Sequence, residues 1–455
     1  MDPAVIQELV DALPDGVVLT EPAAIEKYRE DFARDGSAGK PVAVVRAECA
    51  EHVQVAVRWA ARHQVPVVPR GAGTGLSGGS SAVEGGITIS LDRMRAVEID
   101  TGCRVAVVEP GALNAEVKAA AAEHGLWYPP DPSSYEICSI GGNLATNAGG
   151  LCCVKYGVTT DYVLGMDVVL ADGTLVRLGG KRIKDVAGLS LLKLFVGSEG
   201  TLGIVTRAIL RLIPAQGERA TLVAGFKDLT AASEAVVAIG RRLRPSMMEL
   251  MDNATINAVE DWRSHGLDRS CGALMVAQSD APDAARELEI EHMRTCCEQA
   301  GATEVFCTTD PDEAEAFVAA RRNAFLALEQ LGSLLFEDVG APVPLLPDLV
   351  DGIAAIAADH GVRIPVVAHA GDGNTHPIIV YDATDPASEQ RARAAFSDVM
   401  ALAISLGGTI TGEHGVGRAK KAALPDQLGP DVMALSRRIK DALDPAGILN
   451  PGAVL

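Results

Sequence analysis

Two histidines close the stretch HAGDGNTH, residues 369–376, and a third lies in TGEHGVG, residues 411–417. The chain holds nine histidines, and His369, His376 and His414 lie within 46 residues of sequence, each among glycines. Two histidines and one carboxylate are a standard ligand set for a catalytic divalent ion that keeps positions open for substrate. With Glu413 as the carboxylate, the group predicts a metal site; the alternative is a set of solvated loop histidines.

The segment around the first two histidines, residues 364–382, predicts a strand, a turn and a second strand. A tight loop at residues 371–374 brings the strand ends side by side, so we expect both imidazoles to point at one small space. Glycines around Glu413 and His414 allow close approach of the backbone. The HExxH motif is absent, so a zincin-type metal hydrolase finds no support.

A glycine-rich loop, RGAGTGLSGG at residues 70–79, matches GxGxxG and follows the short apolar run VPVVP. An NAD site of the Rossmann type needs a helix to open at the third glycine. The continuation GSSAVEGGITISL predicts a strand instead, which argues against this reading. Successive backbone N–H groups can still bind a pyrophosphate without a helix, and a plain glycine-rich turn is the alternative.

Helical and extended segments alternate from about residue 40. Residues 41–45 and 65–69 predict strands, residues 50–64 and 113–126 predict helices, and Asp172-Gly173 predicts a hairpin turn. Residues 128–150, rich in Pro, Gly, Asn and Ser, predict a loop. Longer helices follow Pro214, so we place a domain boundary near residue 215. The turn-rich residues 442–455 predict a tail that folds back onto the first domain.

The chain has 455 residues and a formal net charge of -20, without a run rich in Lys and Arg. This argues against nucleic acid or an anionic membrane surface as partner, but not against a small anionic substrate. The N-terminus does not resemble a secretory signal, and no apolar run is long enough to form a transmembrane segment. The nine cysteines include no CxxC, so we expect reduced thiols and a cytoplasmic protein.

Several motifs taken together resemble FAD-dependent enzymes of the vanillyl-alcohol oxidase/PCMH superfamily, in the branch of D-lactate, glycolate and D-2-hydroxyglutarate dehydrogenases. These are PRGAGTGLSGG, PPDPSS, SIGGNLATNAGG, KYGVTTDYVLGMDVVLADG and GSEGTLGIVT, in this order. The resemblance implies an α+β fold with a PCMH-type FAD-binding domain over residues 1–215. It further implies an α+β substrate-binding cap domain over residues 216–439, and a tail, residues 440–455, packing on the FAD domain.

The resemblance also assigns the cofactor residues. The positions that match the loop around the FAD pyrophosphate are Arg70, Gly71, Ala72, Gly73, Thr74, Gly75, Ser77 and Gly78. Those that match segments lining the phosphates and the flavin are Pro132, Ser134, Gly141, Gly142, Asn143, Thr146 and Gly149, and those near the adenine end are Glu199, Gly200 and Ile204. Relatives with covalent FAD carry a histidine where Thr74 stands, so we expect the FAD to be non-covalent.

In the same resemblance, His369, His376 and Glu413 match the metal ligands, and His414 matches the proposed base. The donor set suits zinc, manganese or iron(II) alike. The implied chemistry is a metal-bound 2-hydroxy acid whose hydroxyl proton goes to His414 while hydride passes to the flavin. Arg321 matches an arginine that pairs with the substrate carboxylate; the alternative is a solvated helix face.

Three departures bear on the substrate. Enzymes for D-2-hydroxyglutarate carry Asn, Lys and Thr where this chain has Ile378, Phe336 and Phe325. Burying a second carboxylate against these apolar groups would cost several kcal/mol. We therefore expect a small acid with one carboxylate, of the D-lactate or glycolate type, with D-2-hydroxyglutarate as the alternative. The tail also departs, because Ala453 stands where the family often has lysine.

Two other functions remain open from the sequence. One is a non-redox transferase built on the same FAD domain. The other is a subunit of an electron-transfer complex, whose iron–sulfur centre would lie on another chain because clustered cysteine ligands are absent here. For a dehydrogenase we expect a separate electron acceptor, namely a quinone, a flavoprotein or an iron–sulfur partner. The sequence is compatible with a homodimer.

Overall fold

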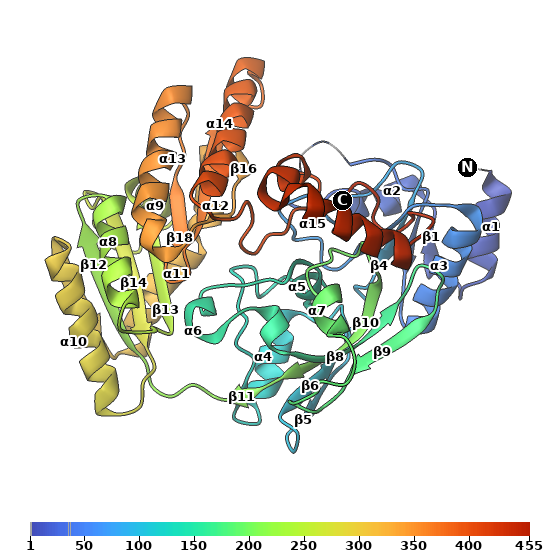
Figure 1. The fold of residues 1–455 in the computed structure, drawn as a ribbon, viewed down its shortest axis with the longest axis horizontal. Coiled ribbons are helices and arrows are strands. Elements are labelled where there is room, and N and C mark those ends of the chain that lie inside the picture. Colours follow the sequence, from blue (N-terminus) through green and yellow to red (C-terminus); the bar gives the residue numbers. More distant parts are fainter. Residues whose placement is uncertain (1, 35, 37) are drawn as a thin grey trace. The chain divides into compact units, whose positions relative to one another are not determined.

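The computed structural model describes residues 2–34, 36 and 38–455. The chain forms two compact units (Figure 1). The first consists of residues 1–149, 158–215 and 413–455, and the second of residues 150–157 and 216–412. Both units contain helices and sheets, which confirms the predicted α+β class.

The first unit begins with a small sheet in the order β1-β2-β4-β3, where β4 runs parallel to both β2 and β3. Its elements are α1 (Pro3–Asp11), β1 (Val18–Leu19), α2 (Pro22–Ile25), β2 (Ala43–Arg46), α3 (Ala50–His63), β3 (Val67–Arg70) and β4 (Ile87–Ser90). The apolar face of α3, including the fully buried Val53 and Trp59, packs with strand residues Val45 and Ile89 in one core. The predicted helix over residues 50–64 and the strands beside it are therefore present.

A second, antiparallel sheet of the first unit has the order β5-β6-β10-β8-β9. The strands and the short pair beside them are β5 (Val97–Asp100), β6 (Val105–Val108), β7 (Leu126–Trp127), β8 (Val163–Val169), β9 (Leu175–Gly179), β10 (Ile204–Arg211) and β11 (Ile213–Pro214), and the helices are α4 (Asn114–Ala122), α5 (Ile140–Thr146) and α7 (Leu191–Phe195). Val117 of α4, Leu144 of α5 and Phe195 of α7 share one core with Ala208 and Leu210 of β10. The hairpin predicted at Asp172-Gly173 joins β8 to β9.

Helix α5 lies where the sequence predicts only a loop. Ser139 caps it, because its hydroxyl accepts the N–H of Gly142, and Ile140 and Leu144 are buried beneath it. The two glycines in its first turn are weak helix formers and conceal the helix in the sequence. The cap and the apolar pair, four residues apart, are the local signals that favour it.

The end of the chain belongs to the first unit. Helix α15 (Leu424–Leu443) precedes a tail that pairs with β3, since Val67 N donates to Ile448 O and Asn450 N donates to Val67 O. Nδ2 of Asn450 donates to the carbonyls of Gly79 and Glu199. The chain enters this unit again at Glu413, earlier than the expected residue 440, because residues 415–418 already pair with the glycine-rich loop and with Glu199.

The second unit is built on an eight-stranded antiparallel sheet in the order β15-β12-β14-β13-β18-β19-β16, with β17 also paired to β19. Its strands are β12 (Ala220–Phe226), β13 (Met247–Asp252), β14 (Ala273–Ser279), β15 (Glu304–Thr308), β16 (Ser333–Phe336), β17 (Val339–Gly340), β18 (Val366–His369) and β19 (Asn374–Tyr381). Its helices are α6 (Cys153–Tyr156), α8 (Leu229–Gly240), α9 (Asn253–Trp262), α10 (Ala284–Gln299), α11 (Pro311–Arg322), α12 (Ala324–Leu328), α13 (Leu346–His360) and α14 (Pro386–Ser405).

Helices cover both faces of this sheet. Helices α9, α11 and α12 pack on the face that carries Val223, Met251 and Val276. Side chains alternate between faces along a strand, so Met275 points to the other face, where Cys297 of α10 contacts it. Helices α13 and α14 lie side by side (Figure 1).

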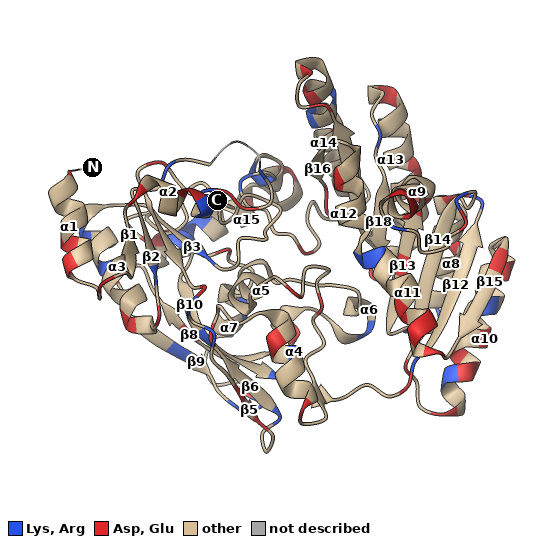
Figure 2. Ribbon diagram, turned by 180° about the vertical axis from the view of Figure 1, so that it is seen from behind, with Lys and Arg blue, Asp and Glu red and all other residues tan. Residues whose placement is uncertain are grey.

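Charged residues are dispersed over the surface of each unit (Figure 2). Acidic positions outnumber Lys and Arg positions, 60 to 40, in keeping with the net charge of -20. Across the described residues, we find no helix with the length and apolarity required to cross a bilayer. The nine cysteines, all within the described residues, are free thiols, as predicted.

Candidate functional site

The hairpin β18–β19 brings His369 and His376 together. Its register pairs His369 with Asn374 and Val367 with His376. Residues paired across antiparallel strands share a face, as do residues two apart on one strand, so both imidazoles lie on the face covered by α9, α11 and α12. The ring centroids are 5.0 Å apart with an interplanar angle of 88°. The predicted convergence of the two histidines is confirmed.

The turn between the strands requires glycine at residue 373. Gly373 has a φ of +82°, and a Cβ there would lie 2.2 Å from the carbonyl oxygen of Ala341. Asn374 N donates to the carboxylate of Asp372, which closes the turn. Asp372 and Asn374 therefore shape the turn between the two histidines, as the sequence predicts.

A buried carboxylate contacts the first histidine. Nδ1 of His369 lies 2.9 Å from both carboxylate oxygens of Glu249, which is only 1% exposed. Glu249 comes from β13, the strand next to β18. Nη2 of Arg321, on the last turn of α11, lies 2.9 Å from Oε2 of the same carboxylate. Arg321 is 4% exposed, so the alternative of a solvated helix face is wrong for this residue.

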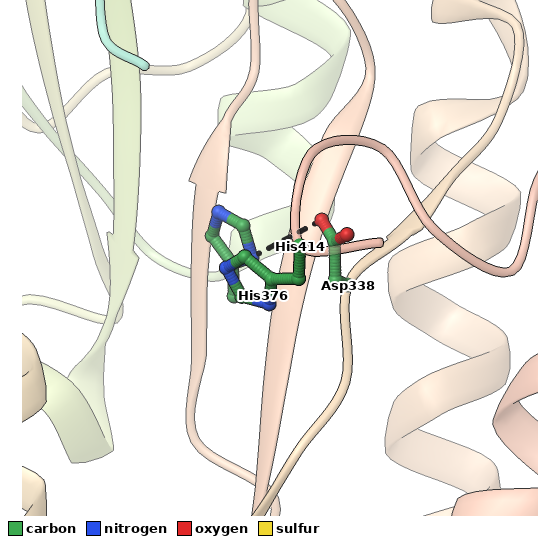
Figure 3. A group of neighbouring side chains, drawn as sticks. All are labelled: Asp338, His376 and His414. Atoms are coloured by element: carbon green, nitrogen blue, oxygen red, sulfur yellow. Dashed lines mark ion pairs between the residues drawn. The ribbon is translucent and has the colours of Figure 1, made fainter. Parts of the chain in front are cut away.

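A second buried carboxylate lies beside the other histidine. Oδ1 of Asp338 is 3.5 Å from Nδ1 of His376, and Asp338 is fully buried. Nδ2 of Asn374 donates to Oδ1 of Asp338, and the Thr411 hydroxyl donates to Oδ2. Figure 3 shows Asp338 directed toward the ring of His376. Each histidine of the hairpin therefore has its own carboxylate neighbour.

The segment before Glu413 pairs with the backbone of residues 338–340. Gly412 N donates to the carbonyl oxygen of Asp338, and Thr409 pairs with Gly340. Ligand-type atoms of His369, His376 and Glu413 lie within 4.8 Å of one another, and so do those of Asp338, His376 and His414 (Figure 3). Each of these two groups could hold a metal ion, and the roles of His369, His376 and Glu413 as ligands and of His414 as base remain predictions.

Apolar side chains lie next to His376 on the same face. Ile378, two residues further along β19, is 2% exposed and pairs in register with Phe336 of β16. The ring of Phe336 stacks on that of Phe325, with centroids 4.7 Å apart. The three residues that depart from the D-2-hydroxyglutarate pattern are therefore neighbours and form one apolar wall, defined as Phe325, Phe336 and Ile378.

The glycine-rich loop of the first unit leaves β3 and lies against the N-terminus of α5. The Ser139 hydroxyl accepts the N–H of Ala72 as well as that of Gly142. Gly73 has a φ of +77°, and a Cβ there would lie 2.1 Å from the guanidinium of Arg70. No helix follows the loop, as predicted, and among the described residues the N–H groups of Thr74 and Gly75 have no acceptor. Such adjacent donors suit a phosphate.

The remaining predicted cofactor residues all lie in this unit. Arg70 donates to the carbonyls of Glu30 and Ser80, and the Ser77 hydroxyl donates to the carbonyl of Gly415. Pro132 and Ser134 precede α5, Gly78 lies near the end of the loop, Gly141, Gly142, Asn143 and Thr146 lie in α5, Gly149 follows it, Gly200 precedes β10, and Ile204 is its first residue. Their contacts with FAD remain a prediction.

Glu199 has a structural part in this arrangement. Its carboxylate is 7% exposed and accepts the N–H groups of Val416 and Gly417. Burial is the largest influence and raises the pKa of Glu199 to about 7. The side chain therefore holds the returning segment of the chain, and its expected place near the adenine stays a prediction.

Sequence reasoning missed Glu249 and Asp338. Glu249 is 120 residues from His369 and stands alone as a charge in the apolar run MMELM. A single carboxylate inside a buried strand needs a partner, and this is the signal that could have drawn attention to it. Asp338 follows an apolar strand together with Glu337, and both are fully buried.

Two family models match the chain. Residues 41–179 match the FAD binding domain, and residues 215–454 match the C-terminal domain of FAD linked oxidases. The chain belongs to the FAD-linked oxidase family. As a member of this family it is an FAD-linked oxidoreductase, and the free N–H groups of its glycine-rich loop fit the phosphates of that cofactor.

Curated relatives in this family are similar over nearly their whole length. Glycolate oxidase subunit GlcD of Bacillus subtilis is 40% identical over 90% of this chain and 88% of the relative. A D-lactate dehydrogenase of Archaeoglobus fulgidus is 35% identical over 90% of this chain and 91% of the relative.

Solved structures share the fold of the FAD-linked oxidase. A p-cresol methylhydroxylase structure matches with a TM-score of 0.82 at 20% identity, covering 99% of this chain and 96% of the other. The 4-ethylphenol oxidase from Gulosibacter chungangensis matches with a TM-score of 0.80 at 23% identity, covering the same shares of both chains. These likenesses confirm the expected PCMH-type architecture.

Proposed function

We propose that this FAD-linked oxidoreductase oxidises a small D-2-hydroxy acid with a single carboxylate, of the D-lactate or glycolate type, to the 2-oxo acid with the help of a divalent metal ion. The observation that carries the proposal is the convergence of His369, His376 and Glu413 next to the apolar wall. The names of the curated relatives, glycolate oxidase subunit and D-lactate dehydrogenase, support the substrate class.

The donor set suits a divalent ion. Two imidazoles and one carboxylate offer ligand atoms within 4.8 Å of one another, and both histidines are largely buried. Three protein ligands of this kind leave positions for a substrate, and zinc, manganese and iron(II) all accept them. When bound, the ion would act as a Lewis acid that lowers the pKa of the substrate hydroxyl.

The chain's own residues would then bind and deprotonate the acid. His414 is the base that accepts the hydroxyl proton, and it lies with His376 and Asp338 in one cluster. Arg321 would pair with the substrate carboxylate. Its Nη2 already contacts Glu249, but Nε has no hydrogen-bond partner among the described residues, so the guanidinium keeps a donor. When bound, FAD, which we expect to be non-covalent, would supply the acceptor for the substrate hydride.

The apolar wall supports a substrate without a second carboxylate. Ile378 and the stacked rings of Phe325 and Phe336 offer no hydrogen bond to a charged group. A carboxylate pressed against them would lose its hydration without gaining a partner. A substituent as small as hydrogen or methyl on the hydroxyl-bearing carbon meets no such cost.

A dehydrogenase of this kind would need a separate electron acceptor. The chain has no clustered cysteine ligands, so its electrons would pass to a separate quinone, flavoprotein or iron–sulfur partner. A relative named as a subunit supports a partner chain. A homodimer is an alternative assembly that a measured mass in solution would decide.

The test is anaerobic mixing of the FAD-loaded protein with D-lactate, glycolate and D-2-hydroxyglutarate. We expect the first two to bleach the flavin and the third to do so more slowly. Fastest bleaching by D-2-hydroxyglutarate would overturn the substrate proposal. Absence of bleaching by all three would favour a non-redox transferase. His414→Ala should keep FAD and metal but lose flavin reduction, and near-normal reduction would remove His414 as the base.

A further inference from the structure

The two histidines of the hairpin share a feature that their role as ligands does not require. In each, Nδ1 faces a buried carboxylate, Glu249 for His369 and Asp338 for His376. Glu249 lies on β13 and Asp338 immediately precedes β17, and both strands neighbour the hairpin within the second unit. An arrangement repeated on two independent strands calls for an explanation beyond chance packing.

The partners of Glu249 indicate which form it takes. Nη2 of Arg321 lies 2.9 Å from Oε2 of Glu249, and both side chains are almost fully buried. A buried arginine stays charged and stabilises an ionised carboxylate. An ionised carboxylate only accepts hydrogen bonds. Nδ1 of His369, 2.9 Å from both oxygens, must therefore carry the proton.

Asp338 lies beside Nδ1 of His376 within ion-pair distance but without hydrogen-bond geometry. Its two oxygens already accept from Asn374 and from Thr411, which marks it as an acceptor. Nδ1 of His376 lies 3.5 Å away. These donors also engage the oxygens that a metal ion would need, so Asp338 is better suited to hold the ring of His376 than to replace Glu413 as a ligand.

We infer that Glu249 and Asp338 are positioning residues that hold His369 and His376 in the tautomer protonated at Nδ1, which leaves the lone pair of Nε2 for a metal ion. Neutral imidazole carries one proton, so fixing it on Nδ1 fixes the ligand atom as Nε2. Carboxylates that accept the second ring N–H also raise the basicity of the ligand nitrogen. Arg321 balances the charge of Glu249.

This inference rests on the proposed metal site, but the tautomer exists without the ion and can be read there. The experiment uses FAD-loaded protein with ¹⁵N-histidine, stripped of metal by a chelator, and records long-range ¹H–¹⁵N spectra at neutral pH. Signals are assigned by single-histidine substitutions. We expect a protonated Nδ1 and an unprotonated Nε2 for His369 and for His376. A protonated Nε2 on His369 in the parent protein would overturn the inference.

Variants of Glu249 separate positioning from folding. Glu249→Leu alone would leave the charge of Arg321 buried without a partner, so it is combined with Arg321→Met. In this double variant we expect His369 to shift toward the Nε2-protonated tautomer and the affinity for Zn²⁺ or Mn²⁺ alone to fall about 10- to 100-fold. Glu249→Gln keeps an oxygen acceptor, so it should preserve the tautomer and lose less affinity.

The matched control is Glu260→Gln. Glu260 is a buried carboxylate of α9 in the same unit, and its partners are the backbone N–H groups of His265 and Leu267 and the Ser264 hydroxyl. Its replacement should leave both tautomers and the metal affinity unchanged. An unchanged His369 spectrum in the double variant would refute the assignment. Correct tautomers in a parent protein that binds no ion would support the positioning role and overturn the metal site instead.

Discussion

Replacing Ile378 with asparagine should turn the enzyme toward a dicarboxylic substrate. In the parent protein, Ile378 is 2% exposed and pairs with Phe336, whose ring stacks on Phe325. An amide at this position places a donor on the face that also carries His376. A hydrogen bond to a charged group is worth about 1.5–3 kcal/mol, which corresponds to about a 10- to 150-fold change in a ratio of rates. We expect kcat/KM for D-2-hydroxyglutarate, relative to D-lactate, to rise by this factor in Ile378→Asn.

The substitution also carries a cost that the assay must separate from specificity. Losing a buried isoleucine side chain removes about 1.5–3 kcal/mol of stability, so FAD content and Tm are measured first. Flavin reduction is then followed anaerobically with each acid. Ile378→Val is the control, because it keeps the wall apolar and should leave the ratio unchanged. A folded, FAD-loaded Ile378→Asn protein with the parent's ratio would refute the reasoning that this wall selects the substrate.

Three further outcomes follow from the structure. Gly73→Ala should lower the FAD bound per chain, measured by flavin absorbance, because its Cβ would meet Arg70 at 2.1 Å and φ is +77°; Gly102→Ala, on an open turn, should not. Burial raises the pKa of Glu199 to about 7 in the folded protein. Between about pH 4.5 and 7 the carboxyl is therefore protonated when folded but ionised when unfolded, so the free energy of unfolding should fall by about 3 kcal/mol as pH rises through this window. The Tm of Glu199→Gln relative to that of the parent should therefore rise with pH over this window. A difference in Tm that does not change with pH would contradict the raised pKa of Glu199. Chelation should slow flavin reduction and leave FAD absorbance intact, whereas full activity in metal-free protein would remove the ion from the mechanism.

The sequence predicts those parts of the molecule that local patterns determine. The apolar alternation and the Gly-Asp-Gly turn around His369 and His376 predict the hairpin, and its register confirms their shared face. The amphipathic helix over residues 50–64 and the strand after the glycine-rich loop are equally local. Each of these signals lies within a stretch of about 20 residues.

Contacts between strands that are distant in the sequence cannot be predicted from local patterns. The pairing of Glu249 with His369 depends on β13 lying next to β18, and no local pattern specifies that neighbour. The burial of Arg321 depends likewise on where α11 docks. The sequence does not predict helix α5 for a different reason. Its glycines have low helix propensity, whereas the cap at Ser139 and the packing of Leu144 stabilise it.

The register of the hairpin has a consequence for how this segment can vary in length. Side chains on a strand change face at every residue, so inserting or deleting one residue in the connection at 370–373 would exchange the faces of β19. His376 and Ile378 would both turn away from His369, while Thr375 and Pro377 would replace them. Changes by two residues would restore the faces. Whether the number of residues in this loop is odd or even thus couples the proposed metal ligand His376 to the apolar wall, and one odd-numbered length change would remove both together.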